Sequence, residues 1–298
     1  MEILVSSNTY PKVSVIIASY NHAPYIEASI RSVMAQTYPN VELLVVDDGS
    51  SDESVSVVNQ LQREFGFDFR VQANQGLSRT LNAAIARSSG EYVAPFGSDD
   101  IMLPNRLALQ VEYMRDKPEV GICAGSVTSI GPDGAPLGND KPPHWRRLDF
   151  EDVFLNRKPG SPAATLLFRR EALEAVGGFD PHIRLEDLVI ELKITHAGWF
   201  IDVLGETLAL YRVHASNTYK NYPFMVENVL MTFSRFSDHP AYKQVCANYR
   251  NSMFLKCARQ DKTLARKLLR ELPLRAWNKK TIKGLYRLLL PAKARERA

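Results

Sequence analysis

Residues 41–52 have the sequence VELLVVDDGSSD, in which a strand-sized apolar run, interrupted only by Glu42, leads directly into a polar turn. Such a run is typical of a strand that is buried on both faces of a parallel sheet. Ser51 or Asp52 can cap the helix that we expect over residues 53–65. This strand–turn–helix unit predicts an α/β fold whose polar loops lie at the carboxyl ends of parallel strands, where open sheets bind their ligands.

The segments on either side continue the alternation of strand and helix. The periodicity predicts further strands over residues 13–18, 69–72 and 92–96, and helices over residues 26–35 and 77–86. The pattern becomes mixed after residue 100, with strands expected over residues 121–130 and 200–204. From residue 223 onward the sequence indicates mostly helices.

The composition is that of a globular protein. The chain of 298 residues is 45% hydrophobic and 23% charged, and no apolar run approaches the roughly 20 residues that a membrane-spanning helix needs. Its three cysteines are widely spaced and form no CxxC pair, which argues against a disulfide framework or a zinc cage. The first residues lack the features of a signal peptide. We therefore expect a cytoplasmic protein.

Positive charge is concentrated towards the C-terminus. Residues 256–298 contain 14 Lys and Arg side chains against three acids, a net charge of +11, which leaves −7 for residues 1–255. Such asymmetry indicates a polyanionic partner, either nucleic acid or an anionic membrane. Nucleic acid is disfavoured because the remainder of the chain is acidic and no aromatic residues alternate with the basic ones. We expect peripheral contact with the inner face of the cell membrane.

The apolar residues of this basic tail leave two interpretations open. Ile282, Leu285, Tyr286 and Leu289 fall on one helical face with lysines beside it, which suits a helix lying in a membrane interface. An amphipathic helix packed on the catalytic domain would show the same pattern.

Three acidic pairs, Asp47/Asp48, Asp99/Asp100 and Glu186/Asp187, stand at the ends of predicted elements. Adjacent carboxylates repel each other, so such pairs often meet a cation or donor hydroxyls, although helix caps and solvated turns also explain them. The chain has no P-loop, no GxG and no GxSxG motif, which disfavours common nucleotide cradles and a hydrolase nucleophile. A phosphorylated ligand would then require a divalent cation held by carboxylates.

The order of these motifs resembles that of the family 2 glycosyltransferases, which have a GT-A-type fold. The matching segments are residues 13–21, 47–52, 74–76, 90–92, 98–104, 177–180 and 211–214, together with Asn82 and Glu186-Asp187. Seven motifs in register favour a site over caps and turns for the acidic pairs. The resemblance covers residues 11–217 and implies a mixed, mainly parallel central sheet.

The resemblance also implies a domain organisation. Residues 1–220 would form the catalytic domain, with a nucleotide-sugar half over 11–104 and an acceptor half over 105–220. Residues 221–298 would be a helical basic extension.

The resemblance assigns roles to individual residues. Ala18 and Tyr20 would hold the base of the donor, and Asp48 would accept from the imide N–H of uracil or thymine. Asp99 would bind Mg²⁺ or Mn²⁺, and Asp187 would act as the general base on the acceptor hydroxyl. Further residues placed at the nucleotide sugar are Asn21, Asn74, Gly76, Arg79, Ser98 and Glu186.

Two departures and one ambiguity accompany the resemblance. Gly97 stands where the first acid of the metal motif is usual, so ribose would be held by Ser98 or by backbone. Leu81 stands where an arginine is common, and Arg79 would reach the phosphates instead. His214 is either a metal ligand or a partly buried histidine on a loop.

The function implied is that of an inverting, metal-dependent glycosyltransferase. It would transfer a hexose or deoxyhexose, for example rhamnose, from a UDP- or dTDP-sugar to a glycan or lipid-linked glycan in lipopolysaccharide or surface-polysaccharide synthesis. The alternative is a non-catalytic protein that keeps the fold and binds a nucleotide sugar or a membrane. Gly97 favours this alternative, whereas Asp99, Asp187 and His214 together favour the enzyme.

Overall fold

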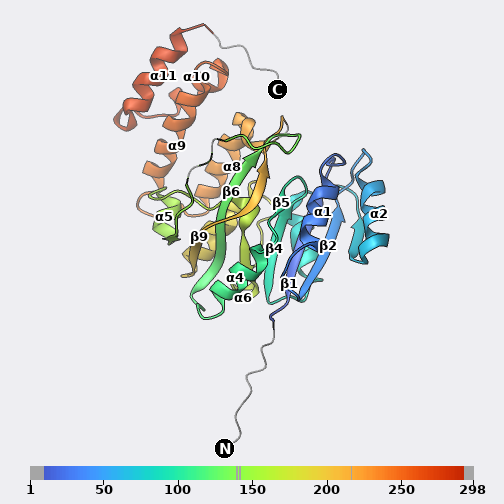
Figure 1. Cartoon of the computed structure of the whole chain (residues 1–298). Coiled ribbons are helices and arrows are strands. Elements are labelled where there is room, and N and C mark those ends of the chain that lie inside the picture. The colour runs from blue at the N-terminus through green and yellow to red at the C-terminus, as the bar shows by residue number, and fades with distance from the viewer. Residues whose placement is uncertain (1–9, 139, 141, 216, 292–298) are drawn as a thin grey trace, which may run out of the picture. The chain divides into compact units, whose positions relative to one another are not determined.

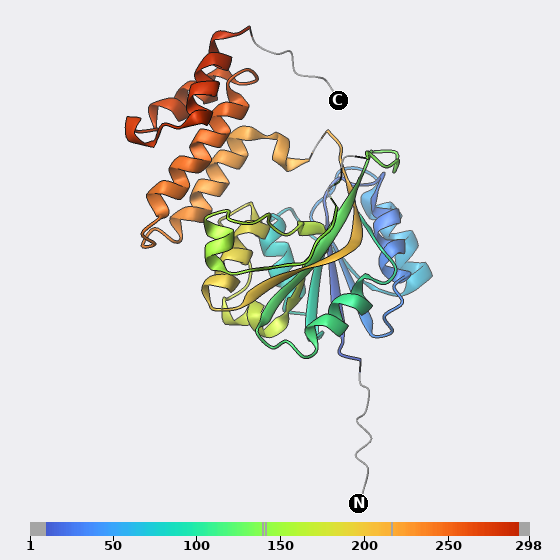
Figure 2. The ribbon, with the colours of Figure 1, turned by 60° about the vertical axis from the view of Figure 1, so that its left-hand side comes forward.

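The computed structural model describes residues 10–138, 140, 142–215 and 217–291, which divide into two compact units, Met1–Val213 and His214–Ala298. The first unit contains one mixed sheet with helices on both faces (Figures 1 and 2). Its strands are β1 (Val13–Ser19), β2 (Val41–Asp47), β3 (Asp68–Val71), β4 (Tyr92–Gly97), β5 (Ile101–Met102), β6 (Val120–Ile130), β7 (Arg146–Leu148), β8 (Leu167–Arg169) and β9 (Phe200–Arg212). The helices of this unit are α1 (Ile26–Met34), α2 (Ser54–Phe65), α3 (Leu77–Ile85), α4 (Arg106–Met114), α5 (Phe150–Phe154), α6 (Arg170–Ala175) and α7 (Glu186–His196).

The strand order is β3-β2-β1-β4-β8-β6-β9-β5, with β7 paired to β9. The four strands from β3 to β4 are parallel throughout, whereas β8 is antiparallel to both of its neighbours. This confirms the predicted α/β class and the mixed central sheet.

The apolar run of β1 is explained by burial on both faces of the sheet. Val15 and Ile17 belong to a core shared with α1, α2 and α4. Ile16, between them, belongs to a second core shared with α3, α6 and α7. Because successive side chains of a strand point to opposite faces, a strand covered on both faces must be apolar at every position.

Strand β9 is much longer than the predicted strand over residues 200–204. Gly205 and Glu206 interrupt its apolar pattern, yet pairing with β6 continues to Arg212. The register of the β6–β9 pair shifts near Ala124 and Ser126, which indicates a β-bulge at this point. The short strands β5, β7 and β8, of two or three residues each, were not predicted because they are too short to show a period.

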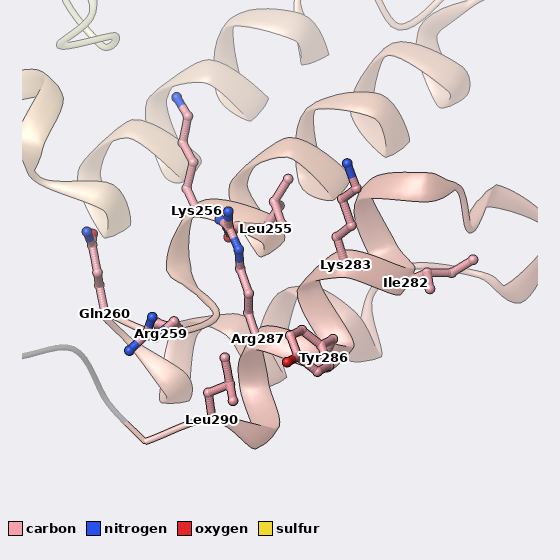
Figure 3. Close-up of a pocket in the computed structure, with 9 residues that line it drawn as sticks. All are labelled: Leu255, Lys256, Arg259, Gln260, Ile282, Lys283, Tyr286, Arg287 and Leu290. Atoms are coloured by element: carbon pink, nitrogen blue, oxygen red, sulfur yellow. Dashed lines mark hydrogen bonds between the residues drawn. The ribbon is translucent and has the colours of Figure 1, made fainter.

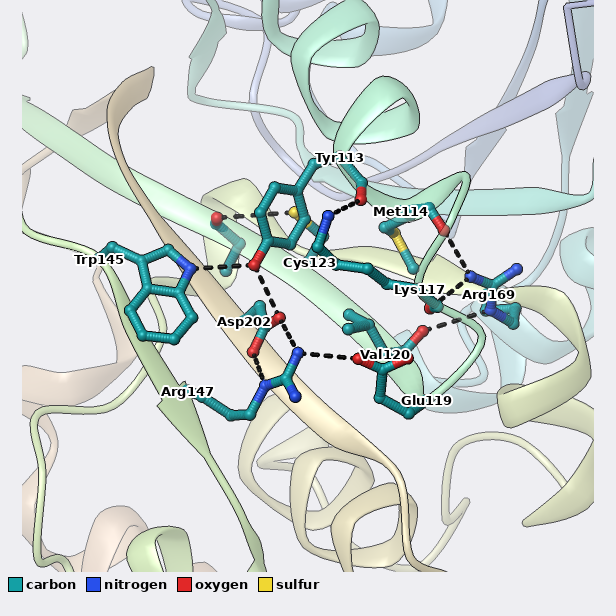
Figure 4. A network of polar contacts seen from close by, with 11 residues as sticks. Tyr113, Met114, Lys117, Glu119, Val120, Cys123, Trp145, Arg147, Arg169 and Asp202 are labelled. Carbon is teal, nitrogen blue, oxygen red and sulfur yellow. Dashed lines mark hydrogen bonds and ion pairs between the residues drawn. The ribbon is translucent and has the colours of Figure 1, made fainter.

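A polar network fixes β7 to the outer part of the sheet (Figure 4). Asp202 on β9 is fully buried, and its two carboxylate oxygens each accept a hydrogen bond of 2.7 Å from Arg147 on β7. Tyr113 donates its hydroxyl to the same carboxylate at 2.9 Å. A buried carboxylate is tolerated when it is paired and hydrogen-bonded in this way.

The second unit is helical, as predicted for the C-terminal extension. It consists of α8 (Tyr222–Ser234), α9 (Tyr242–Cys257), α10 (Lys262–Arg270) and α11 (Lys279–Leu289). Their apolar side chains form a separate core around Met253, Phe254 and Leu268. No helix built from the described residues combines the length and the apolar character needed to cross a membrane.

Helix α11 packs on α9 through a face that shares only Leu285 with the predicted apolar face. Thr281 and Gly284 are buried on α9, and Leu285 packs against the helical core. Ile282, Tyr286 and Leu289 are 66%, 67% and 85% exposed. The predicted face therefore divides, because its Leu285 is part of the packing while the other three residues face outward.

Gly284→Val should loosen the contact between α11 and α9. A Cβ atom at position 284 would lie 2.4 Å from Cε1 of the fully buried Phe254 ring, so the two helices would have to separate. Overpacking of this kind typically costs about 1–3 kcal/mol. Thermal unfolding would show it as a lower melting temperature. Gly160→Val is the matched control, since no atom lies within 4 Å of the added Cβ and the backbone there is not in the left-handed region, and it should leave the melting temperature close to that of wild type.

Candidate active site at the carboxyl edge of the sheet

The predicted site segments that follow β1, β2 and β4 lie together because these three strands are neighbouring and parallel. In the register of the sheet, Ala18 is paired with Val46 on one side and with Gly97 on the other. Asp48 and Ser98 are thus placed one or two residues beyond the same edge. The topology brings the predicted base-binding and metal-binding segments to adjacent strand ends.

The loop after β1 is hydrogen-bonded to the loop after β2. Asn21 donates its N–H to Ser50 Oγ at 2.9 Å, and its side-chain carbonyl accepts from Ser51 N at 2.8 Å. Asn21 has a φ of 55°, a left-handed conformation that asparagine tolerates better than most residues. The preceding Tyr20 is 52% exposed, so its ring is accessible at this edge.

Asp48 is 4% exposed and organises the segment that leads into α3. Its Oδ1 accepts from Gln72 Nε2 and Gln75 N at 2.8 and 3.0 Å, and its Oδ2 accepts from Gly76 N at 2.9 Å. Because two carboxylate oxygens offer about four acceptor positions, one further donor can be accommodated. The carboxylate is therefore pre-oriented by three donors.

The turn after Asp48 requires glycine at position 49. Gly49 has a φ of 82°, and a Cβ there would lie 2.9 Å from the backbone nitrogen of Asn74. The positive φ and the close approach both exclude larger residues. This contact places the predicted Asn74 beside the Asp47-Asp48 turn.

Three potential metal ligands come together at the same edge. Each of His22, Asp99 and His214 offers a ligand atom that lies within 4.8 Å of the other two. His214 follows Val213 directly, and the Val213 amide bonds Ile130 O at 2.8 Å, so this position is continuous with the β6–β9 pair. Carboxylate and imidazole ligands suit first-row divalent metals, and the cluster is consistent with a divalent-metal site.

His22 was not predicted from the sequence as a site residue. Its Nδ1 is hydrogen-bonded to Ser98 Oγ at 2.6 Å, and Ser98 itself is buried. Histidines that bind metals are commonly oriented by a hydrogen bond at the second ring nitrogen. The Ser98 hydroxyl, which the resemblance assigns to ribose, is hydrogen-bonded to this histidine, and its role at ribose stays a prediction.

Arg212 and Asp100 fix the backbone on which the proposed metal ligand Asp99 lies. Asp100 accepts from the backbone N–H of Arg212 at 2.9 Å, and Arg212 donates its Nε–H to the carbonyl of Asp99 at 2.8 Å. Burial, together with the neighbouring Asp99, raises the pKa of Asp100 to about 7. A Cβ on Gly97 would lie 2.9 Å from Asp99 Oδ1 and 2.8 Å from Asp100 Oδ2. Glycine therefore leaves room for both carboxylates in this conformation.

A second acidic cluster lies at the beginning of α7. Glu186 and Asp187 occupy its first turn, and Glu191 follows one helical turn after Asp187. Burial and the nearby Asp187 raise the pKa values of Glu186 and Glu191 to about 8. Burial raises the pKa of Asp187 as well. Ser161 donates its hydroxyl to Glu191 and offsets part of this cost.

Helix α3 links the Asp48 turn to the acidic cluster at the beginning of α7. Its first turn follows Gly76, which donates to Asp48. Asn82 bonds both backbone groups of Phe179, and Ser78 Oγ donates to Ile183 O at 3.2 Å, so α3 also holds the segment before α7.

The two departures from the family pattern have different environments on α3. Leu81 is buried in the second core of the sheet. Arg79 is exposed, and its role at the phosphates stays a prediction.

Comparison with known proteins gives the same family as the motifs. A profile of "Glycosyl transferase family 2" matches residues 14–177. An uncharacterized glycosyltransferase from Nostoc sp. is 35% identical over 217 residues, which cover 70% of this chain and 66% of that relative. The putative teichuronic acid biosynthesis glycosyltransferase TuaG of Bacillus subtilis is 33% identical over 217 residues, covering 70% of this chain and 81% of TuaG.

Solved structures share the fold. S. aureus TarS 1–349 in complex with UDP-GlcNAc aligns with a TM-score of 0.65 at 17% identity, over 89% of this chain and 82% of TarS 1–349. The mannosyltransferase PcManGT from Pyrobaculum calidifontis, in complex with GDP-Man and Mn²⁺, aligns with a TM-score of 0.62 at 18% identity, over 94% of this chain and 86% of PcManGT. The family profile matches more than half of the residues, and TuaG is aligned along most of its length. The chain therefore belongs to glycosyl transferase family 2.

Proposed function

We propose that this protein is an inverting, divalent-metal-dependent glycosyltransferase that moves a hexose or deoxyhexose from a UDP- or dTDP-sugar to a glycan acceptor. The observation that carries the proposal is the cluster of His22, Asp99 and His214 in a family 2 chain. His22 and Asp99 follow β1 and β4, close to the Asp48 turn that follows β2, and His214 follows β9. A nucleoside diphosphate needs both a base pocket and compensation of its phosphate charge, and these two segments supply them.

The base of the donor would lie between Tyr20 and Asp48. The exposed ring of Tyr20 can stack on a pyrimidine, and the backbone of Ala18 at the end of β1 can contact its edge. The carboxylate of Asp48 has one acceptor position left for an imide N–H, the group that uracil and thymine share.

The diphosphate would lie beside His22, Asp99 and His214, which would hold the cation. A bound Mg²⁺ or Mn²⁺ would neutralise negative charge on the departing nucleoside diphosphate. Ser98 would keep the His22 ring in its orientation through the Nδ1 hydrogen bond. Asn21, Asn74, Gly76 and Arg79 complete the proposed donor-binding residues.

Asp187 would act as the general base. The acceptor oxygen attacks the anomeric carbon as the bond to the diphosphate oxygen breaks, and the hydroxyl proton passes to the Asp187 carboxylate. Attack opposite the leaving group inverts the anomeric configuration. Burial raises the pKa of Asp187, and a base titrating closer to neutrality takes a proton more effectively than an ordinary aspartate. Glu186, its neighbour in the helix, would position the acceptor or donor sugar.

The acceptor that we propose is a glycan or lipid-linked glycan of a cell-surface polysaccharide or lipopolysaccharide. The name of TuaG refers to teichuronic acid, and another relative, 24% identical over 192 residues, is the poly-beta-1,6-N-acetyl-D-glucosamine synthase of Staphylococcus epidermidis. We propose a cytoplasmic enzyme that meets such acceptors by peripheral contact with the inner face of the membrane. A rhamnosyl donor rests on the resemblance alone.

Gly97 supports a second candidate function, that of a non-catalytic nucleotide-sugar-binding protein. It removes a carboxylate that the metal motif usually contains. Incubation of the protein with a nucleotide sugar and Mn²⁺ in the absence of acceptor distinguishes the two functions, since slow hydrolysis of the donor requires a working leaving-group site. A protein that binds donors with no release of nucleoside diphosphate would favour the second function.

A panel of nucleotide sugars tests the proposed donor class. UDP- and dTDP-sugars at about 100 times their Kd should stabilise the fold by about 2.7 kcal/mol, a shift of several degrees in melting temperature. The shift should require Mn²⁺ or Mg²⁺. A larger shift with GDP-mannose than with any UDP- or dTDP-sugar would contradict the assignment of the base.

A further inference from the structure

A groove in the second unit is lined mainly by basic and apolar side chains (Figure 3). It has a volume of about 490 Å³ and lies between the end of α9 and the outward face of α11. Lys256 and Arg259 come from the α9 side, and Lys283 and Arg287 come from α11. The lining contains four cationic side chains and no carboxylate, so its electrostatic potential selects for anions.

Two details indicate that these cations are not satisfied within the protein. The Nε of Arg259 is buried and has no hydrogen-bond partner among the described residues. A buried donor without a partner is costly, and an external acceptor would remove that cost. Among the described residues, the Arg287 guanidinium makes one long contact, 3.4 Å from Nη1 to the carbonyl of Leu255, which leaves most of its donors for a ligand.

The beginning of α11 is also unusual in charge. Lys279 and Lys280 occupy its first turn, Lys283 follows, and no acid lies in that turn. The amino end of a helix carries partial positive charge, so lysines there are unfavourable unless an anion is near. The sequence of α11 thus favours an anion near its first turns, and of these three lysines Lys283 lines the groove.

The rim of the groove is apolar and exposed. Ile282 and Tyr286 line it and are 66% and 67% exposed, and Leu289, on the same helix, is 85% exposed. A free phosphate or a nucleic-acid backbone would gain nothing from burying these side chains. A lipid presents a phosphate and, directly behind it, acyl chains that could cover them.

We propose that the α9–α11 groove binds the phosphate headgroup of an anionic membrane lipid, with Arg259, Lys283 and Arg287 on the phosphate and Ile282 and Tyr286 inserted at the acyl boundary. The inference rests on the membrane contact proposed above and gives that contact a defined site. It is independent of donor binding, since none of the residues that line the groove belongs to the proposed donor site.

Co-sedimentation with vesicles tests the site. The full chain should bind vesicles of 30% phosphatidylglycerol in phosphatidylcholine, and vesicles of phosphatidylcholine alone should bind it far less. The groove variant Arg259→Gln/Lys283→Gln/Arg287→Gln should lose on the order of 100-fold in partition coefficient, because each basic residue at an anionic surface strengthens binding roughly fivefold. Ile282→Ser/Tyr286→Ser should also weaken binding while the dependence on salt remains.

A matched control separates a groove from general charge attraction. Arg266→Gln/Lys267→Gln/Arg270→Gln removes the same three charges from exposed positions of α10, and we expect a much smaller loss. If the two variants lost vesicle binding equally, the groove would not be a specific lipid site, and the membrane contact would depend on general charge attraction. All variants should keep the wild-type melting temperature and the Mn²⁺-dependent shift with nucleotide sugar.

Other results would contradict the proposal directly. If the wild-type protein did not bind phosphatidylglycerol vesicles but was stabilised by inorganic phosphate, the groove would be a site for small anions and not for lipids. Tighter binding to an oligonucleotide than to the vesicles would assign the groove to nucleic acid. Failure to bind vesicles alongside a normal nucleotide-sugar shift would remove the membrane contact and leave the transferase proposal intact.

Discussion

Asp187→Asn should lower kcat by roughly 10²–10⁴-fold, the usual contribution of a positioned general base. The amide keeps the size of the side chain but cannot take the proton of the acceptor hydroxyl. Affinity for the nucleotide should change little, because Asp187 acts on the acceptor. Release of nucleoside diphosphate measures kcat, and titration calorimetry with UDP or dTDP measures the affinity.

The pH dependence gives an independent test of the same assignment. A base works only when deprotonated, so the raised pKa of Asp187 places the rising limb of kcat at a higher pH than an ordinary aspartate would. Burial and the Asp187 charge raise the pKa of Glu191 to about 8, so Glu191 is largely protonated, and therefore neutral, while Asp187 ionises. Glu191→Gln keeps that neutral form and should therefore leave the rising limb close to its wild-type pH, whereas Asp187→Asn should remove the limb. If Asp187→Asn kept most of its kcat and Glu186→Gln lost it, Glu186 would be the base.

The parallel half of the sheet could be predicted because its sequence signal is local. Burial on both faces makes β1 and β2 continuous apolar runs, and each ends at polar residues that the fold then collects at one edge. The far half could not be predicted in the same way. Strand β7 has no period of its own, because a partner from a distant part of the chain determines it, through pairs such as that of Arg147 with Asp202.

The sequence could indicate those candidate site residues that belong to a motif. Asp48 and Asp99 stand inside recognisable segments, whereas His22 has no ligand spacing to any other histidine. Its place beside Ser98 depends on β1 and β4 being neighbouring parallel strands. The strand order was the missing information, since two loops that follow adjacent parallel strands must meet at one edge.

The basic tail shows where periodicity alone is insufficient. Helical spacing placed Leu285 on one face with Ile282 and Tyr286, but the close approach at Gly284 rotates that face relative to α9. A glycine in the middle of a helix costs about 1 kcal/mol against alanine. Its presence in α11 was a signal of helix packing that the charge pattern concealed.

Asp99→Asn should abolish metal-stimulated turnover without changing the fold. Asp99 is the only carboxylate among the three clustered ligands described, and an amide oxygen is a weaker ligand for a hard divalent cation than a carboxylate. Donor binding should then lose its dependence on Mn²⁺, because the variant no longer holds the cation that compensates the charge of the donor's two phosphates. Thermal unfolding should remain close to that of wild type.

Ser98→Ala should weaken metal binding without abolishing it. Because it removes no charge, it separates the effect of metal coordination from the effect of a lost carboxylate charge. It removes the hydrogen bond that orients His22, and the loss of such an outer partner typically weakens metal binding about 10–100-fold. The concentration of Mn²⁺ for half-maximal activity should rise accordingly while activity at saturating metal largely recovers. Asp116→Asn, at an exposed acid outside the cluster, should leave the metal dependence as in wild type. Full activity of the wild-type protein in excess chelator would show that turnover needs no divalent cation at this cluster.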